Sequence, residues 1–64
     1  MERYVIRDSE AGTAYMDSYE TIQECIDRIK EYEAWDKKEG IYTEGTYEVY
    51  DQLEKETVVH GYEL

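Results

Sequence analysis

The stretch DSYETIQECIDRIKEYEAWDKKEG, residues 17–40, decides the fold. Its apolar side chains recur every three or four residues, which is the spacing of one stripe along an amphipathic helix. The stripe consists of Ile22, Cys25, Ile26, Ile29, Tyr32 and Trp35. We therefore expect a helix of about five turns that packs this stripe against another element.

Signals at both ends of this stretch predict where the helix begins and ends. Asp17 is followed three residues later by Glu20, which is the spacing of a capping box, and Ser18 is an equally good N-cap. The lysines at positions 37–38 oppose the helix dipole in the last turn. Gly40 is placed to end the helix in the left-handed conformation.

Two strands are expected before the helix. Residues 3–7 are rich in β-branched and aromatic side chains, and apolar groups on both faces predict a central strand. Residues 13–16 return as its hairpin partner. In the turn between them, Asp8 can hydrogen-bond the backbone and Gly12 can take the left-handed conformation.

The segment after the helix completes the expected sheet. Residues 41–45 read as a loop, residues 46–50 as a third strand and residues 51–56 as an acidic turn. Residues 57–60 are either a short fourth strand or a tail. The sequence thus predicts one α+β domain, residues 1–64, with the order ββαβ(β). Right-handed crossover gives an antiparallel sheet in the order 2-1-3, with a possible fourth strand at the edge.

A single helix covers only one face of such a sheet. Depending on register, the other face would carry one of two sets on the first strand, either Arg3, Val5 and Arg7 or Tyr4, Ile6 and Asp8. An uncovered face and open edges favour a partner or a homodimer.

The charge of the chain is its most unusual feature. The 64 residues include 17 acids against 7 bases, for a net charge of −10. Such a charge disfavours binding to nucleic acid and to anionic membranes and favours a basic groove on another protein. The alternative interpretation is that the charge serves only solubility.

Catalytic and metal chemistry find little support. Cys25 and His60 are the only residues of their types, and the apolar stripe buries Cys25, which makes its thiol inert. Zinc sites need clusters of these residues, and no calcium-loop pattern is present. We therefore expect no enzyme activity, no cofactor and no metal. The lone cysteine and the lack of a long apolar run predict a cytoplasmic protein.

Eight tyrosines, with no phenylalanine, supply most of the aromatic area. A tyrosine ring can fill the edge of a core while its hydroxyl reaches a polar partner. Tyrosine is also common at protein interfaces.

Two groups of residues are candidates for binding a partner. The first, the strand-side set, is Glu39, Tyr42, Glu44, Tyr47, Glu48, Tyr50, Asp51, Glu54 and Glu56. The second, the outer acidic face of the helix, is Glu20, Glu24, Asp27 and Glu31. Arginine binds carboxylate and phosphate with the same bidentate geometry, so rows of acids can imitate a nucleic-acid backbone. Pairing of Arg28 with Glu24, and of Lys30 with Asp27, would weaken the second row.

Residues 4–12, 17–22, 32–42 and 47–51 carry a hairpin, cap and helix-end pattern that resembles small proteins of bacteria and their phages whose function is unknown. In size and charge the chain also resembles phage-encoded anti-CRISPR proteins that act as DNA mimics. That resemblance implies an inhibitor that occupies the site where an RNA-guided nuclease holds target DNA, often the protospacer-adjacent-motif region. It implies no particular site residues.

The sequence therefore favours an acidic binding protein that docks into a basic protein groove, most concretely on a CRISPR effector nuclease. The alternative is a small homodimeric structural or regulatory module.

Overall fold

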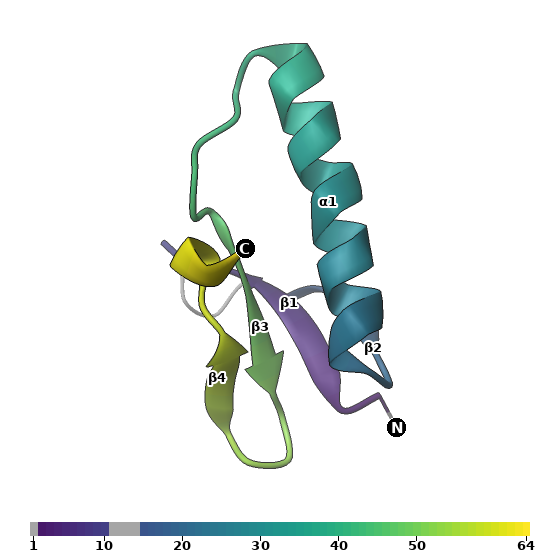
Figure 1. Ribbon diagram of the computed structural model, residues 1–64. Coiled ribbons are helices and arrows are strands. Elements are labelled where there is room, and N and C mark those ends of the chain that lie inside the picture. The colour runs from purple at the N-terminus through teal and green to yellow at the C-terminus, as the bar shows by residue number, and fades with distance from the viewer. Residues whose placement is uncertain (1, 11–14) are drawn as a thin grey trace.

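The computed structural model describes residues 2–10 and 15–64 of the chain. Its elements are β1 (Tyr4–Asp8), β2 (Tyr15–Tyr19), α1 (Ile22–Glu39), β3 (Tyr47–Asp51), β4 (Glu56–Val59) and a short 3-10 helix, η1 (Gly61–Glu63). The strands form an antiparallel sheet in the order β2-β1-β3-β4 (Figure 1). The predicted α+β fold and strand order are confirmed, and the predicted segment 57–60 contributes to a fourth strand, β4, which ends at Val59 rather than at His60.

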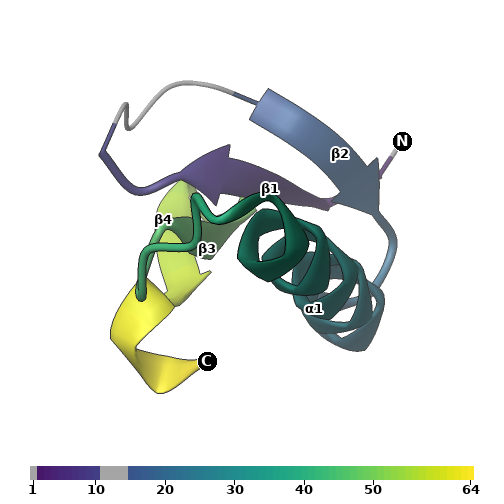
Figure 2. The ribbon, with the colours of Figure 1, turned by 90° about the horizontal axis from the view of Figure 1, so that it is seen from above.

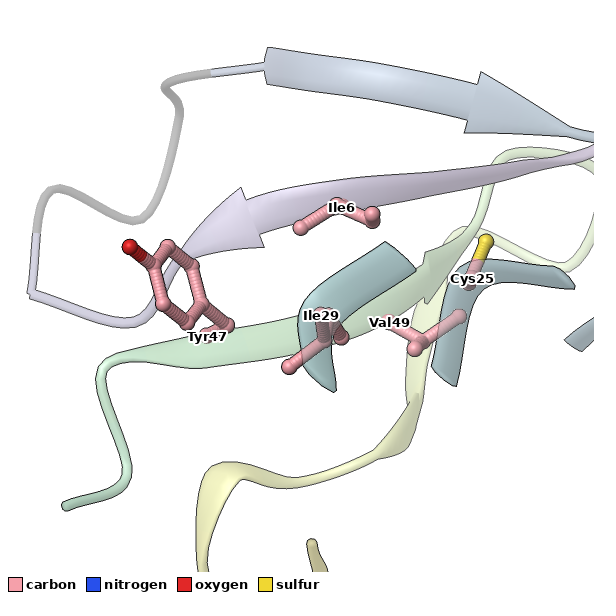
Figure 3. Packing of buried hydrophobic residues seen from close by; sticks show 5 residues of the cluster. All are labelled: Ile6, Cys25, Ile29, Tyr47 and Val49. Atoms are coloured by element: carbon pink, nitrogen blue, oxygen red, sulfur yellow. The ribbon is translucent and has the colours of Figure 1, made fainter. Parts of the chain in front are cut away.

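The core lies between α1 and the central strands. Seen from above, α1 runs along one side of the sheet (Figure 2). Ile6 on β1 is directly opposite Val49 on β3, and both are fully buried. The buried cluster consists of Ile6, Cys25, Ile29, Tyr47 and Val49 (Figure 3). The alternation of β1 puts Ile6 on the helix side and Val5 on the opposite side, which is the open face.

The helix begins later than the sequence predicts, so the expectation of a cap at Asp17 or Ser18 is wrong. Strand β2 continues to Tyr19, which pairs with Tyr4 and packs against the core. Thr21 is the N-cap, and its hydroxyl oxygen accepts a hydrogen bond of 3.2 Å from the backbone N–H of Glu24. Burial of a further strand residue decides the boundary here, because several good capping residues are available.

The two turn predictions differ in outcome. Asp8 accepts a hydrogen bond of 2.8 Å from the backbone N–H of Glu10, as expected. The left-handed conformation predicted for Gly12 lies outside the described residues.

At the end of α1, Gly40 has φ 74° and its N–H binds the carbonyls of Asp36 and Lys37, which confirms the predicted helix end.

Trp35 does not join the core, so that part of the predicted stripe is wrong. Its side chain is 60% exposed, whereas Cys25 and Ile29 are fully buried. The helix is 18 residues long and the strands have four or five, so α1 extends past the end of the sheet (Figure 1). The last turns of the helix therefore lie beyond the ends of the strands, although the Tyr47 side chain on β3 still reaches Asp36.

Two tyrosine–aspartate hydrogen bonds fasten α1 to the sheet from opposite directions. Tyr32 on the helix donates to Asp17 on β2, and Tyr47 on β3 donates to Asp36 on the helix. The Tyr32 and Tyr47 rings also contact each other, with centroids 5.5 Å apart. The expected use of tyrosine at the core edge is confirmed at these positions, where phenylalanine would lose the hydrogen bonds.

The segment after β4 packs against the loop before β3 through two glycines. A Cβ atom added to Gly61 would lie 2.4 Å from the carbonyl oxygen of Gly45. This approach is closer than any side chain allows, so the position of η1 depends on the missing side chain at Gly61.

We predict that Gly61→Ala lowers the free energy of unfolding by about 1–3 kcal/mol, because the added methyl forces the two backbone segments apart. Urea unfolding measures this change. Tyr62→Ala, next in the chain and 81% exposed, serves as a control and should change stability by less than about 0.5 kcal/mol. Equal stability of Gly61→Ala and the unmodified chain would contradict the glycine contact.

Candidate protein-binding surface

The strand-side set does not form one surface. Glu39 ends α1, Glu44 lies in the following loop, and Glu54 and Glu56 lie in the β3–β4 turn and at the start of β4. All four are exposed. Tyr42 is half-buried, with the Lys37 ammonium 4.7 Å from its ring centroid. These side chains thus come from separate parts of the fold.

Asp51 is buried and bound within the chain. Its side chain is 2% exposed and accepts hydrogen bonds from Arg3 Nε and Nη2, at 3.0 and 2.8 Å. The backbone N–H groups of Leu53 and Glu54 also donate to it, at 2.9 and 3.2 Å. The hydrogen bonds from Arg3 and from these backbone groups lower the pKa of Asp51 from 3.8 to about 2. This carboxylate organises the β3–β4 turn.

Glu48 is likewise used inside the molecule, on the open face of the sheet. It is 8% exposed, and its Oε2 accepts a hydrogen bond of 3.0 Å from Nε of Arg7 on the neighbouring strand and lies 2.8 Å from Nη2 of the same guanidinium. Thr57 on β4 donates to the same oxygen, at 3.3 Å. The Arg7 guanidinium lies 4.2 Å from the ring centroid of Tyr50. The acid, the arginine and the ring form a layer across β1, β3 and β4.

This layer corrects the expectation of an uncovered sheet face. The register puts Val5 and Arg7 on that face, which is one of the two predicted sets. Val5 is only 4% exposed although α1 lies on the other side. Val5 and Arg7 are therefore both largely shielded from solvent on this face.

The burial of Tyr47, Glu48 and Asp51 removes three residues from the predicted contact surface. Tyr47 fills the core, and the two acids neutralise arginines.

All four residues predicted for the outer acidic face of the helix, Glu20, Glu24, Asp27 and Glu31, are exposed. Glu20 precedes the N-cap Thr21, so only Glu24, Asp27 and Glu31 lie on α1 itself. The expected pairing of Arg28 with Glu24 is not what the structure shows, because Arg28 binds Asp17 at 3.3 Å and Glu31 at 3.2 Å. Asp27 accepts a hydrogen bond of 2.9 Å from the uncharged Gln23 side chain. This face therefore keeps most of its negative charge.

Every arginine of the chain is bound to a carboxylate of the same chain. Arg3 binds Asp51 and lies 4.0 Å from Glu54, Arg7 binds Glu48, and Arg28 bridges two acids. The strongest basic groups are thus committed to holding the fold together. The outward acids are left to face solvent.

Sequence reasoning missed a hollow near the end of α1. Arg28, Glu31, Tyr32 and Trp35 line this open space of about 350 Å³. Comparing the length of the helical pattern with the short strands would have given the signal, because a stripe longer than its sheet must leave an aromatic residue exposed.

The lone thiol and the lone imidazole lie in different environments. Cys25 is fully buried in α1, and burial raises the pKa of its thiol to about 11. His60 is exposed after β4 and stacks on Tyr62, with ring centroids 5.2 Å apart.

Within residues 2–10 and 15–64, no cluster of three or more His, Cys, Asp or Glu side chains could hold a metal ion. In the same part of the chain, no helix has the length and apolar character needed to cross a membrane.

Comparisons with protein-family models, with curated proteins and with solved structures found no match.

We predict that Glu48→Ala destabilises the fold by about 3 kcal/mol, because it leaves the Arg7 guanidinium without its carboxylate. Thermal or urea unfolding measures the loss. Glu44→Ala removes the same charge from an exposed loop and should cost less than about 0.5 kcal/mol. Similar stability of the two variants would mean that the fold does not need Glu48, which would then be available to bind a partner.

The low pKa of Asp51 predicts a specific pH dependence. A carboxylate whose folded pKa lies near 2, below its ordinary 3.8, stabilises the fold fully above about pH 4 and loses that effect as pH falls toward 2. The difference in unfolding free energy between the unmodified chain and Asp51→Asn should therefore shrink over this range. Glu54→Gln is the control, and a difference for Asp51→Asn that is constant with pH would contradict the prediction.

Proposed function

We propose that this protein binds a basic groove on another protein through the outer acidic face of α1, and that its carboxylates take the place of nucleic-acid phosphates. The observation that carries the proposal is the division of charge. Buried and bridging acids hold all the arginines, while Glu24 and Asp27 on the helix surface have no cation bound to them among the ion pairs of the described residues.

The geometry of the helix suits this role. Residues three and four apart on a helix face lie about 5–6 Å from each other, so Glu24, Asp27 and Glu31 form a regular row. A helix held by a core presents that row on a rigid body, which limits the entropy lost on binding. An arginine fork can grip each carboxylate as it would grip a phosphate.

The kind of partner follows from the same chemistry. A groove that binds the backbone of a nucleic acid carries arginine and lysine at short intervals, and long-range attraction would speed its encounter with a chain of net charge −10. We therefore propose a nucleic-acid-binding protein as the target, with an RNA-guided nuclease that loses access to its target DNA as the most concrete case. Binding of this type weakens as salt rises.

Charge reversal tests the proposal. We predict that Glu20→Lys, Glu24→Lys and Asp27→Lys, combined in one variant, weaken binding to the partner more than tenfold, because three attractions become repulsions. The assay is displacement of labelled target duplex from a panel of RNA-guided nucleases, measured by fluorescence anisotropy at several salt concentrations.

The strand-side acids provide a matched control. Glu44→Lys, Glu54→Lys and Glu56→Lys make the same change of net charge at exposed sites away from the outer acidic face. They should reduce displacement much less than the helix variant does. Equal losses would mean that net charge alone drives binding, and a greater loss in the control would move the contact surface to the strand side.

A further inference from the structure

The hollow at the end of α1 combines two aromatic rings with a carboxylate. Tyr32 and Trp35 lie one turn apart on the helix, and Glu31 lies beside them. Trp35 is 60% exposed, although an indole is among the most costly side chains to leave in water. The ring belongs neither to the buried cluster nor to the hydrophobic residues packed against it.

The rings of this hollow already attract cations within the chain. The Arg28 guanidinium lies 5.1 Å from the Tyr32 centroid, and the Lys38 ammonium lies 5.7 Å from the Trp35 centroid. Both distances fall within the range of cation–π attraction. The faces of the rings are therefore turned toward positions that a positive group can occupy.

The two internal cations are held differently. Arg28 is fixed by Asp17 and Glu31, at 3.3 and 3.2 Å, so it forms one wall of the hollow with its charge balanced. Lys38 is exposed and has no carboxylate within ion-pair distance among the described residues. Lys38 is not among the residues that line the hollow, so it leaves the hollow open to an incoming cation.

The charge of the neighbouring helix surface indicates which kind of group the hollow binds. The outer acidic face continues from this hollow toward the start of the helix, so the partner is basic. A second copy of the chain is disfavoured because both copies carry a net charge of −10. Among basic groups, a guanidinium is planar, weakly hydrated and able to stack on an aromatic ring while it binds a carboxylate, whereas a lysine ammonium is not.

We propose that the hollow between Tyr32 and Trp35 receives an arginine side chain of the partner, stacked on Trp35 and hydrogen-bonded to Glu31. This inference rests on the proposed function, which it deepens by naming the side chain recognised and the residue that anchors it. Exposed aromatic residues of this type often supply much of the affinity of an interface.

Trp35 is the only tryptophan, so its fluorescence reports on the hollow directly. Titration with a hexa-arginine peptide should change that fluorescence, whereas a hexa-lysine peptide of equal charge should change it much less. Calorimetry at low salt should show the arginine peptide binding about threefold more tightly than the lysine peptide. In Trp35→Leu, the ratio of the two affinities should fall markedly.

Two lysine variants give a matched control. Lys38→Ala removes a competing cation from the Trp35 ring and should raise affinity for the arginine peptide. Lys37→Ala makes the same charge change beside Tyr42 rather than Trp35 and should raise it less.

The possible failures are distinguishable. If both peptides bind but the affinity ratio is the same in Trp35→Leu, the arginine site is overturned while the acidic surface stands. If neither peptide binds at low salt, both the arginine site and the proposed function are overturned.

Discussion

The ion pairs between arginines and buried acids are the constraint on which the rest of this structure depends. Arg3 with Asp51 and Arg7 with Glu48 join strands that are far apart in sequence, and each acid is almost wholly shielded from water. A buried carboxylate is unfavourable unless it is paired and hydrogen-bonded, and here each receives a guanidinium and further donors. This small acidic chain thus neutralises its buried carboxylates with two of its arginines.

This use of the arginines determines the character of the surface. Because Arg3 and Arg7 are committed to the sheet and Arg28 to Asp17 and Glu31, Glu24 and Asp27 remain on the helix without a bound cation among the ion pairs of the described residues. The helix itself is fastened by Tyr32 and Tyr47, whose hydroxyls bind aspartates across the core. The same geometry carries the last turns of α1 beyond the sheet and leaves Trp35 exposed. Negative charge and exposed aromatic area therefore both lie on α1.

The sequence predicts much of the fold, because local patterns determine it. The helical stripe as far as Tyr32, the left-handed Gly40 and the strand at residues 47–51 all depend on near neighbours, and the structure agrees with each. The fates of Glu48 and Asp51 depend instead on which residues oppose them across the sheet. An alternating strand pattern cannot tell whether an acid meets an arginine or water, since that depends on register. The start of α1 and the exposure of Trp35 were missed for a similar reason, since both depend on where the sheet ends.

Amide chemical-shift mapping during titration with a basic peptide tests the central claim most directly. The account predicts that the perturbed amides cluster along α1, from Glu24 to Lys38, while Arg7, Glu48 and Asp51 keep their shifts because their ion pairs stay intact. Perturbations centred on β1 and β3 instead would show that the buried acids open toward a partner, and would contradict the division of charge described above.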